Sequence, residues 1–400
     1  MIYRKFDKLE IETSLLGFGC MRFPTLENGK IDEEKAEQMI DLAIKNGVNY
    51  IDTAYPYHNG DSEPFLGKIL NKYPRNSYFL ATKLPIWAIN TKDDVYRIFN
   101  DQLQRLDTEF IDFYLLHAMN KDYFIKVKDL GIIEICEELR KEGKIKYLGF
   151  SFHDSYEVFC EILNYYHWDF CQIQFNYMDT EIQAGLKGYE LAKAKGIPLI
   201  VMEPIKGGLL AKLPKEISMM LSKNSNHKSD SSYALRYVSS FDNVKVILSG
   251  MSTLEQVEDN LDTFNNYMEL SKNEQLTITK VVNSLKNRLK NGCTGCRYCM
   301  PCPYGVDIPN NFAIWNQFGI YDNKEIFENR IIQNIKNEKY RRRAELKKTA
   351  YLLTKAFEIA DEVYNEAYEV FLEFQIKMRN AEIERLIEQG LIAVSYTHLT

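Results

Sequence analysis

The sequence predicts an α/β fold, namely a closed (β/α)8 TIM barrel followed by a cysteine-rich segment and a helical tail. Two observations carry this prediction. Between about residues 14 and 270, short β-rich runs alternate with amphipathic stretches, which is typical of a parallel sheet with crossover helices. The chain has 400 residues, enough for one barrel of this kind and an extension.

Eight runs rich in β-branched and aromatic residues are the candidate strands of the barrel. Each run is short and is bounded by turn-forming residues or by a change to helical spacing. The predicted strands cover residues 15–20, 50–53, 78–83, 110–116, 147–152, 171–175, 199–203 and 244–249.

Amphipathic stretches between these runs are the candidate helices, because their apolar residues recur at helical spacing. They cover residues 32–45, 64–71, 92–105, 129–141, 155–166, 181–195 and 231–241, with two further helices at 257–267 and 273–289. Before the first strand, Phe6, Leu9 and Ile11 alternate with other residues. This alternation predicts a hairpin over residues 3–14 that caps one end of the barrel.

The predicted domain organisation has four parts. Residues 1–270 form the barrel, and residues 271–335 hold a helix and the cysteine-rich segment. Residues 336–393 are a helical tail of uncertain origin, since the chain from 337 to 389 is charged and lacks Pro and Gly. Residues 394–400 resemble translated sequencing-adapter read-through, so we expect them to be a sequence artefact.

The charge balance excludes some classes of partner. Fifty basic residues stand against 56 acidic ones, a formal net charge of -6, which is no general footprint for nucleic acid or an anionic membrane. No apolar run reaches the length of a membrane span, and residues 1–10 hold no apolar signal-peptide core. We therefore expect a cytoplasmic protein without a membrane or nucleic-acid partner.

Four polar residues fall where such a barrel builds its chemistry, at the C-terminal ends of its strands. Asp52 and Lys83 end the second and third predicted strands, Tyr57 follows Asp52, and His117 follows the fourth strand. A lysine ammonium beside a phenol lowers the phenol pKa from about 10. We therefore predict Tyr57 as a proton donor, with Asp52 holding Lys83 in place and a neutral His117 orienting a carbonyl oxygen.

Each of the four residues alone has an ordinary structural explanation. An Asp at a strand end is often a helix N-cap, and a Lys there is usually a surface residue. A His after an apolar strand is often a core residue, and Tyr57 is one of 26 tyrosines. The four together, at matching ends of neighbouring strands, indicate a catalytic group.

Three short motifs contain these residues. They are Asp-Thr-Ala-Tyr-Pro-Tyr at 52–57 with Gly60, Ser62 and Glu63 after it, Ala-Thr-Lys-Leu at 81–84, and Asp-Phe-Tyr-Leu-Leu-His at 112–117. The motifs resemble the signatures of the aldo/keto reductase family, and the likeness runs from about residue 15 to 260. The resemblance implies the same catalytic tetrad with Tyr57 as proton donor. It also implies a small-molecule carbonyl substrate, and NADP or NAD bound across the barrel mouth without a Rossmann domain.

By the same resemblance, ten residues are expected to contact the cofactor. Ser151 and Gln172 match the family's ligands of the nicotinamide carboxamide, the alternative being that both are interior polar residues of the barrel. The full set is Ser151, Gln172, Met202, Pro204, Gly207, Gly208, Gly250, Gln256, Asp259 and Asn260. Met202 stands near where many relatives stack a tyrosine, and the glycines after it permit close approach to the pyrophosphate. Members that bind NADP place Lys and Arg where Gly250 and Gln256 stand, so NAD is an open alternative.

Four cysteines lie within ten residues after the predicted barrel. They are Cys293, Cys296, Cys299 and Cys302, with a proline after the last. The run resembles the bacterial ferredoxin [4Fe–4S] motif, with two residues instead of three before the final Cys. A subgroup of aldo/keto reductases carries a similar run after the barrel. A structural zinc site is the alternative, although zinc sites usually separate two Cys pairs by a longer loop.

No cysteine follows Cys302, so the sequence supports at most one 4Fe-4S cluster. Either all four cysteines serve it, or another ligand replaces Cys302, or a second cysteine run has been lost. Two functions besides carbonyl reduction stay open, because fold alone does not settle function. One is a nucleotide-binding redox sensor, and the other is an electron-transfer subunit that couples the cluster to the nicotinamide, with an electron-transfer partner as a further expectation. Candidates for lining a substrate pocket are Trp87, Tyr55, His58 and Tyr177.

Overall fold

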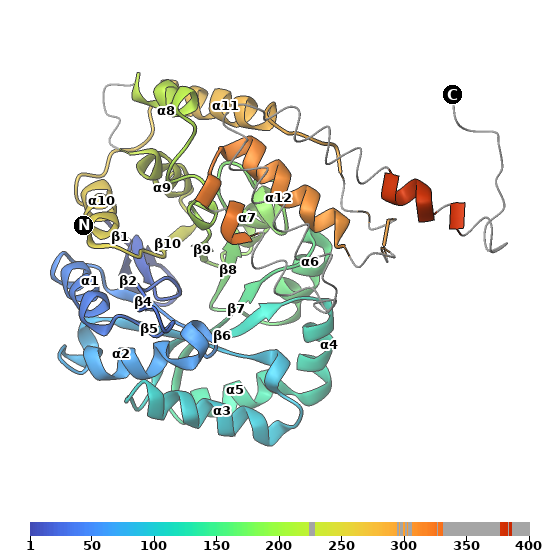
Figure 1. Ribbon diagram of the computed structural model, residues 1–400. Helices are drawn as coiled ribbons and strands as arrows, with labels where there is room; N and C mark the ends of the chain where they lie inside the picture. The colour runs from blue at the N-terminus through green and yellow to red at the C-terminus, as the bar shows by residue number, and fades with distance from the viewer. Residues whose placement is uncertain are drawn as a thin grey trace. The chain divides into compact units, whose positions relative to one another are not determined.

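Eight parallel strands close into a barrel in this computed structural model (Figure 1). The structure describes residues 1–223, 229–293, 296, 299–300, 302, 306–325, 327–330, 377–382 and 384–385. The strands run around the barrel in the order β10-β3-β4-β5-β6-β7-β8-β9. Their bounds are β3 Leu16–Gly19, β4 Tyr50–Asp52, β5 Phe79–Leu84, β6 Ile111–Met119, β7 Ile145–Phe152, β8 Phe170–Gln174, β9 Leu199–Met202 and β10 Val244–Ser249. All eight predicted strands are confirmed, with ends that differ by a few residues.

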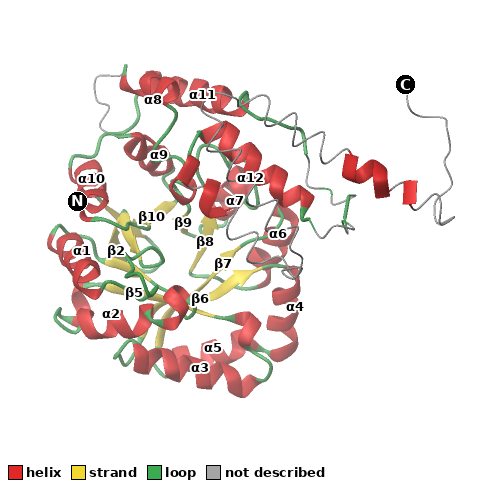
Figure 2. Ribbon diagram, in the orientation of Figure 1, coloured by secondary structure: helices red, strands yellow, loops and turns green. Residues whose placement is uncertain are grey.

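Helices surround the barrel and cover the outer faces of its strands, as Figure 2 shows in red. They are α1 Glu33–Lys45, α2 Ser62–Leu70, α3 Lys92–Arg105, α4 Lys121–Leu130, α5 Ile132–Lys141, α6 Tyr156–Tyr165, α7 Gly185–Ala194, α8 Lys215–Ser222, α9 Asp230–Ser239 and α10 Leu254–Asn265. Side-chain caps fix several starts, since Asp32, Asn120, Ser155 and Thr253 each accept a bond from a backbone N–H three residues on. Capping of this kind explains why α1, α6 and α10 begin within a few residues of where the sequence predicts.

Two outer helices were not predicted from the sequence, and one was predicted too long. Helices α4 and α8 are short and follow loops at the barrel mouth. The predicted helix at 129–141 is interrupted by Gly131, which has φ +61° and ends α4 in the left-handed conformation. Glycine adopts that conformation without steric cost, so the chain turns there and α5 starts anew.

The predicted hairpin closes the N-terminal end of the barrel. Strands β1 (Tyr3–Phe6) and β2 (Ile11–Ser14) pair antiparallel, and Phe6 is completely buried. The Phe6 ring lies 5.7 Å from the ring of Phe113, an inward residue of β6. This contact places the hairpin residue in the cluster of side chains that fills the barrel interior.

One glycine is required by that interior. A Cβ atom added to Gly149 on β7 would lie 2.7 Å from the ring of Phe170 on the neighbouring strand. The absent side chain therefore makes room for an aromatic ring in the centre of the barrel.

The chain divides into two compact units, Met1–Leu285 and Lys286–Thr400. Helix α11 (Lys272–Lys286) falls almost wholly in the first unit, where Glu274 accepts from both NH groups of Arg236 at 2.8 and 3.2 Å. Both side chains are buried, so this bidentate pair ties α11 to α9.

The second unit contains helix α12 (Ile308–Tyr321), which was not predicted from the sequence. Its buried Asn316 accepts from the backbone N–H of Lys290 and Asn291 at 3.1 and 2.9 Å, and donates to the carbonyl of Asn291 at 2.9 Å. These bonds join the segment before the cysteine run to the helix after it. Of the predicted tail at 336–393, residues 377–382 and 384–385 are helical, while the rest and residues 394–400 lie outside the described residues. Over the part of the chain that is described, no helix is long and apolar enough to cross a membrane.

Candidate active site

The barrel brings the four predicted catalytic residues together at the C-terminal ends of three adjacent strands. Asp52 ends β4, Lys83 is the next-to-last residue of β5, and His117 lies near the end of β6. The parallel register pairs Asp52 with Ala81 and Lys83 with Leu115, which sets these strand ends side by side. Tyr57 approaches from the loop that leaves β4.

Lys83 is the centre of the group. Its Nζ donates to Oδ1 of Asp52 at 2.7 Å, to the carbonyl of Thr53 at 2.6 Å and to the hydroxyl of Tyr57 at 3.3 Å. The lysine is completely buried, and Asp52 is 2% exposed. An ammonium ion has three donors, so all three are used and Lys83 is held in one position.

Tyr57 reaches Lys83 from a tight turn. It begins the short 3-10 helix η1 (Tyr57–Gly60), in which His58 and Asn59 have φ of +52° and +56°. Left-handed backbone at residues other than glycine is uncommon and costs free energy, and it concentrates at functional sites. The turn brings the phenol ring to 4.8 Å from Lys83 Nζ, so that the lysine contacts both the ring and the hydroxyl.

His117 is aimed by an irregularity in β6. The pairing of β6 with β7 shifts register between Leu116 and Met119, and Ala118 has φ +55°. Such a bulge re-directs the neighbouring side chain. The imidazole of His117 lies 6.2 Å from the Tyr57 ring, edge to face, and its Nδ1 is shielded from solvent without a hydrogen-bond partner in the structure.

The protonation states of the four residues follow from burial and from the charges around them. Burial raises the pKa of the Tyr57 phenol, and Lys83 offsets only part of that rise. Burial alone would lower the pKa of Lys83, but Asp52 and Tyr57 outweigh it, so the pKa is raised. Burial raises the pKa of Asp52, which Lys83 opposes. Burial, and then the charge of Lys83, lower the pKa of His117 well below its usual value.

The site therefore combines a phenol that keeps its proton, a charged lysine and a neutral imidazole. Lys83 lowers the pKa of Tyr57, as the sequence predicts. The net shift is nevertheless upward, contrary to the prediction, because burial is the larger effect. The prediction of a neutral His117 agrees with the direction of its pKa shift.

The two residues predicted to hold the nicotinamide carboxamide lie side by side. Ser151 on β7 pairs in register with Gln172 on β8, and both are buried. Ser151 Oγ accepts from the backbone N–H of Ala118 at 2.8 Å, and Gln172 Nε2 lies 3.4 Å from the sulfur of Met202. Oε1 of Gln172 is buried without a hydrogen-bond partner in the structure, so this acceptor is available to an amide donor.

The loop after β9 has an unusual backbone. Glu203, Lys206, Gly207 and Gly208 all have positive φ, of 57°, 51°, 61° and 91°. Pro204 is buried, while Gly207 and Gly208 are half-buried in a short 3-10 turn. No side chain screens the backbone at the two glycines, which is what a close approach to a phosphate requires.

The predicted adenosine-binding residues lie at the end of β10 and the start of α10. Gln256 Oε1 accepts from Ser252 N at 2.8 Å, and Asp259 accepts from Ser229 Oγ at 2.8 Å. Asn260 is buried and donates to Ser249 Oγ at 2.7 Å. These side chains hold the loop together, and their part in cofactor binding stays a prediction.

Sequence reasoning did not identify Arg22, which the fold brings to this loop. A Cβ added to half-buried Gly250 would lie 2.8 Å from Cγ of Arg22, and Ser252 Oγ donates to the carbonyl of Arg22 at 2.7 Å. The side chain of Arg22 is exposed. The sequence feature that could have identified Arg22 is its position just after the first predicted strand. This position puts a basic residue at the same end of the barrel as the tetrad.

The four candidate pocket residues have different surroundings. Trp87 is 41% exposed, and its ring lies 5.0 Å from that of His117. Tyr55 donates its hydroxyl to Asp101 on α3 at 3.1 Å. Of the other two, His58 is half-buried and Tyr177 is buried. Trp87 therefore contacts the tetrad through the ring of His117.

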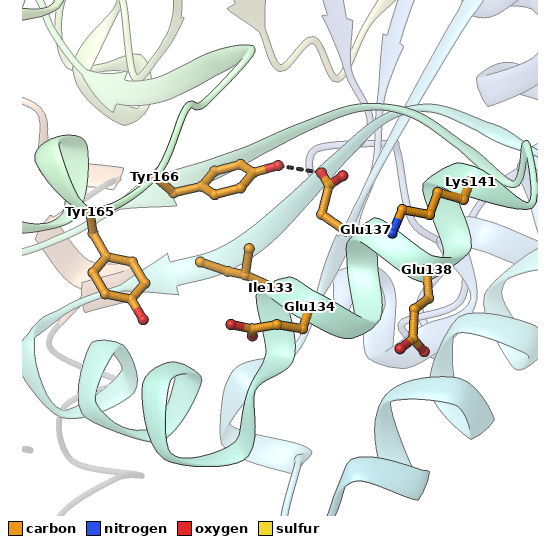
Figure 3. A pocket seen from close by; sticks show the side chains of 7 residues that line it. All are labelled: Ile133, Glu134, Glu137, Glu138, Lys141, Tyr165 and Tyr166. Carbon is orange, nitrogen blue, oxygen red and sulfur yellow. Dashed lines mark hydrogen bonds between the residues drawn. The ribbon is translucent and has the colours of Figure 1, made fainter.

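A hollow of about 490 Å³ lies elsewhere, beside α5 (Figure 3). In it Tyr166 donates its hydroxyl to Glu137, drawn as the dashed line. The lining residues are Ile133, Glu134, Glu137, Glu138, Lys141, Tyr165 and Tyr166. None belongs to the tetrad or to the predicted cofactor contacts, so this hollow is separate from the candidate active site.

The four cysteines of the predicted cluster lie in the second unit. Cys293, Cys296 and Cys299 are exposed, and Cys302 is half-buried. Within the described residues, no three His, Cys, Asp or Glu side chains gather as they would around a metal ion. The structure therefore gives the cysteine run no support beyond its spacing.

Comparison with known proteins places this barrel among oxidoreductases. The model of the "Aldo/keto reductase family" matches residues 15–283. The "Uncharacterized oxidoreductase YqkF" of Bacillus subtilis (strain 168) is 27% identical over 296 residues, which cover 66% of this chain and 90% of that protein. The NADH-specific methylglyoxal reductase of Escherichia coli (strain K12) is 29% identical over 201 residues, 46% of this chain and 60% of that protein.

Solved structures agree with the fold. The aldo-keto reductase AKR11C1 from Bacillus halodurans, in its holo form, superposes with a TM-score of 0.60 at 28% identity, over 70% of this chain and 96% of that one. The thermostable aldo-keto reductase Tm1743 in complex with epalrestat gives a TM-score of 0.58 at 22% identity, over 70% of this chain and all of that one, and shows the fold alone.

Proposed function

The chain belongs to the aldo/keto reductase family, and from this premise we propose that Tyr57 is the proton donor in the reduction of an aldehyde or ketone to an alcohol. The protein is an NAD(P)H-dependent oxidoreductase, and the nicotinamide, when bound, supplies the hydride. One observation carries the proposal: Lys83 Nζ bonds both Asp52 and the hydroxyl of Tyr57, beside a neutral His117.

The residues of the chain then have complementary roles. As the carbonyl carbon accepts the hydride, its oxygen gains negative charge and takes the proton of the Tyr57 hydroxyl. The ammonium of Lys83 stabilises the phenolate that is left, and Asp52 keeps that ammonium charged and in place. We propose that His117, whose ring lies 6.2 Å from that of Tyr57, binds the same oxygen and orients the substrate.

We propose that Ser151 and Gln172 hold the nicotinamide carboxamide, with Met202 against the ring. The buried, unpartnered Oε1 of Gln172 supports this placement. Pro204, Gly207 and Gly208 would follow the pyrophosphate, and the loop with Gly250, Gln256, Asp259 and Asn260 the adenosine. NADP and NAD both remain candidates. Arg22, which lies beside Gly250, is a cation for pairing the 2′-phosphate of NADP.

The decisive test is Tyr57→Phe in an assay of carbonyl reduction with NADH and with NADPH, across aldehydes, ketones and methylglyoxal. We expect turnover to fall by roughly 10²–10⁴-fold, the contribution of a positioned acid, while nucleotide binding is kept. Tyr96→Phe, which alters a phenol on α3 that donates to Glu138, is the matched control and should leave turnover unchanged. Nucleotide binding without turnover that depends on Tyr57 would overturn the proposal.

We propose that the cysteine run binds one 4Fe-4S cluster, with Cys293, Cys296, Cys299 and Cys302 as its ligands. The spacing supports this, since four thiolates are the donor set of such a cluster. We expect about four iron and about four sulfide per chain in anaerobically purified protein, the content of one cluster. One zinc per chain without sulfide would establish the zinc alternative. An electron-transfer or sensor role would rest on this cluster, and no contact of the described residues favours either.

A further inference from the structure

A fully buried carboxylate lies behind the candidate active site. Glu63, in the first turn of α2, has no exposed surface. Its Oε1 accepts from the Thr82 hydroxyl at 2.6 Å and from Nε2 of Gln102 at 2.9 Å. Oε2 has only the guanidinium of Arg105, at 3.8 Å. A buried carboxylate is costly to desolvate, so a residue with no role beyond packing would be apolar here.

The contacts of Glu63 lead directly to the backbone of Lys83. Gln102 Nε2 also donates to the Lys83 carbonyl at 3.0 Å, and the Tyr114 hydroxyl donates to Oε1 of Gln102 at 2.8 Å. The amide of Gln102 is therefore oriented from both ends, by a donor at its oxygen and by acceptors at its nitrogen. Glu63 is one of those acceptors, and Thr82 precedes Lys83 in the chain.

Ser62, the residue before Glu63, contacts Thr53, whose carbonyl binds the ammonium of Lys83. Ser62 Oγ lies 2.8 Å from Oγ1 of Thr53, and the carbonyl of Thr53 accepts from Lys83 Nζ at 2.6 Å. Both residues of the first turn of α2 therefore bind the ends of β4 and β5. Through them α2 fixes the backbone of Lys83 and one acceptor of its ammonium.

We propose that Glu63 is a positioning residue for catalysis, which acts through Thr82 and Gln102 to hold Lys83 against Tyr57 and Asp52. The inference rests on the proposed function, because it assigns a role to Glu63 in the reaction assigned to Tyr57. Glu63 acts by geometry and not by charge, because the position of Lys83 depends on Oε1 of Glu63 as the acceptor for Thr82 and Gln102. A neutral acceptor of the same shape should therefore substitute for the carboxylate.

Substitutions at Glu63 test this inference. Glu63→Ala should lower kcat about 10–100-fold through loss of alignment, with KM and nucleotide Kd within about twofold. Glu63→Gln can still present an oxygen to Thr82 and Gln102, and should restore kcat to near the wild-type value. In Glu63→Ala the loosened Lys83 no longer lowers the Tyr57 pKa as much. The loss of kcat at alkaline pH, where the phenol deprotonates, should then move to higher pH.

Hydrogen exchange of the full-length protein supplies a readout that does not depend on turnover. Amides at 80–84 should exchange faster in Glu63→Ala and in the milder Thr82→Val, and at the wild-type rate in Glu63→Gln. Gln102→Leu should behave like Thr82→Val, whereas Gln104→Leu, at an exposed position of the same helix, should change neither rate nor exchange. Wild-type kcat and exchange in Thr82→Val and Gln102→Leu would overturn the inference. If the wild-type protein reduces no carbonyl, the proposed function fails, whatever the exchange shows.

Discussion

The ammonium nitrogen of Lys83 lies 2.7 Å from Oδ1 of Asp52, and both side chains are almost completely buried. An ion pair removed from water is stable only while both partners are present, because either charge alone has no compensation. The same contact therefore serves the reaction and makes the barrel sensitive to the loss of either residue.

A double-mutant cycle at this pair should show strong coupling. Lys83→Met and Asp52→Leu are each expected to lower the free energy of unfolding by about 3–5 kcal/mol, the cost of leaving one buried charge unpaired. The double variant should lose much less than the sum, since no charge is then buried. Denaturant unfolding of all four proteins measures this, and additive losses would contradict it.

The low pKa of His117 should make stability fall in mild acid. The unfolded chain binds a proton at this residue near pH 6.5, whereas the folded protein resists protonation because of burial and Lys83. Stability is therefore fully present above about pH 6.5 and is lost as the pH falls below it, toward the lower folded pKa. His117→Gln should flatten the free energy of unfolding between about pH 7 and 5. An unchanged slope would show that another group controls this range.

Gln172→Leu should have opposite effects on stability and on cofactor binding. The buried, unpartnered Oε1 of Gln172 costs free energy in the protein without nucleotide, so an apolar side chain of similar size should leave the melting temperature unchanged or raise it. The Kd for NAD(P)H should increase. Gln174→Leu is the matched control, because Gln174 donates to Asp179 at 2.9 Å and its loss should lower stability with little change in Kd. A lower melting temperature with unchanged Kd for Gln172→Leu would contradict the assigned role.

Arg22→Gln should separate the two cofactors. If the guanidinium pairs the 2′-phosphate, the Kd of NADPH should rise about tenfold, the worth of one hydrogen bond between charged groups, and that of NADH should change little. Arg97→Gln, which breaks an exposed pair with Asp94, is the control. Equal changes for both nucleotides would instead place Arg22 at the pyrophosphate.

The barrel and its tetrad could be predicted because they depend on order along the chain. Alternating strands and helices predict the parallel sheet, and strand ends then fall at one rim, so Asp52, Lys83 and His117 had to converge. The turn at Tyr57 was harder, since its left-handed residues His58 and Asn59 give no sequence signal of the glycine kind. The position of a residue in the barrel can therefore be predicted from the order of strands and helices, whereas the backbone conformation of a turn cannot.

Contacts between side chains distant in sequence could not be predicted. Glu63, Thr82 and Gln102 come from three different elements, and nothing in their spacing shows that they meet in a buried network. The same holds for Arg22 beside Gly250. The net pKa of Tyr57 was out of reach too, because the dominant effect is burial, which depends on the complete fold.

Phe6 packs on Phe113 at the end of the barrel opposite the tetrad, as part of the cluster of side chains that fills the interior. The consequence is kinetic. A filled interior leaves no passage through the barrel, so we expect cofactor and carbonyl compound to enter at the same end, with the nucleotide binding first. We therefore expect an ordered sequence, in which the alcohol departs before the spent nucleotide, and product-inhibition patterns of a random sequence would refute it. The packed interior beneath the tetrad is thus the physical reason for the order of binding that we expect at the barrel mouth.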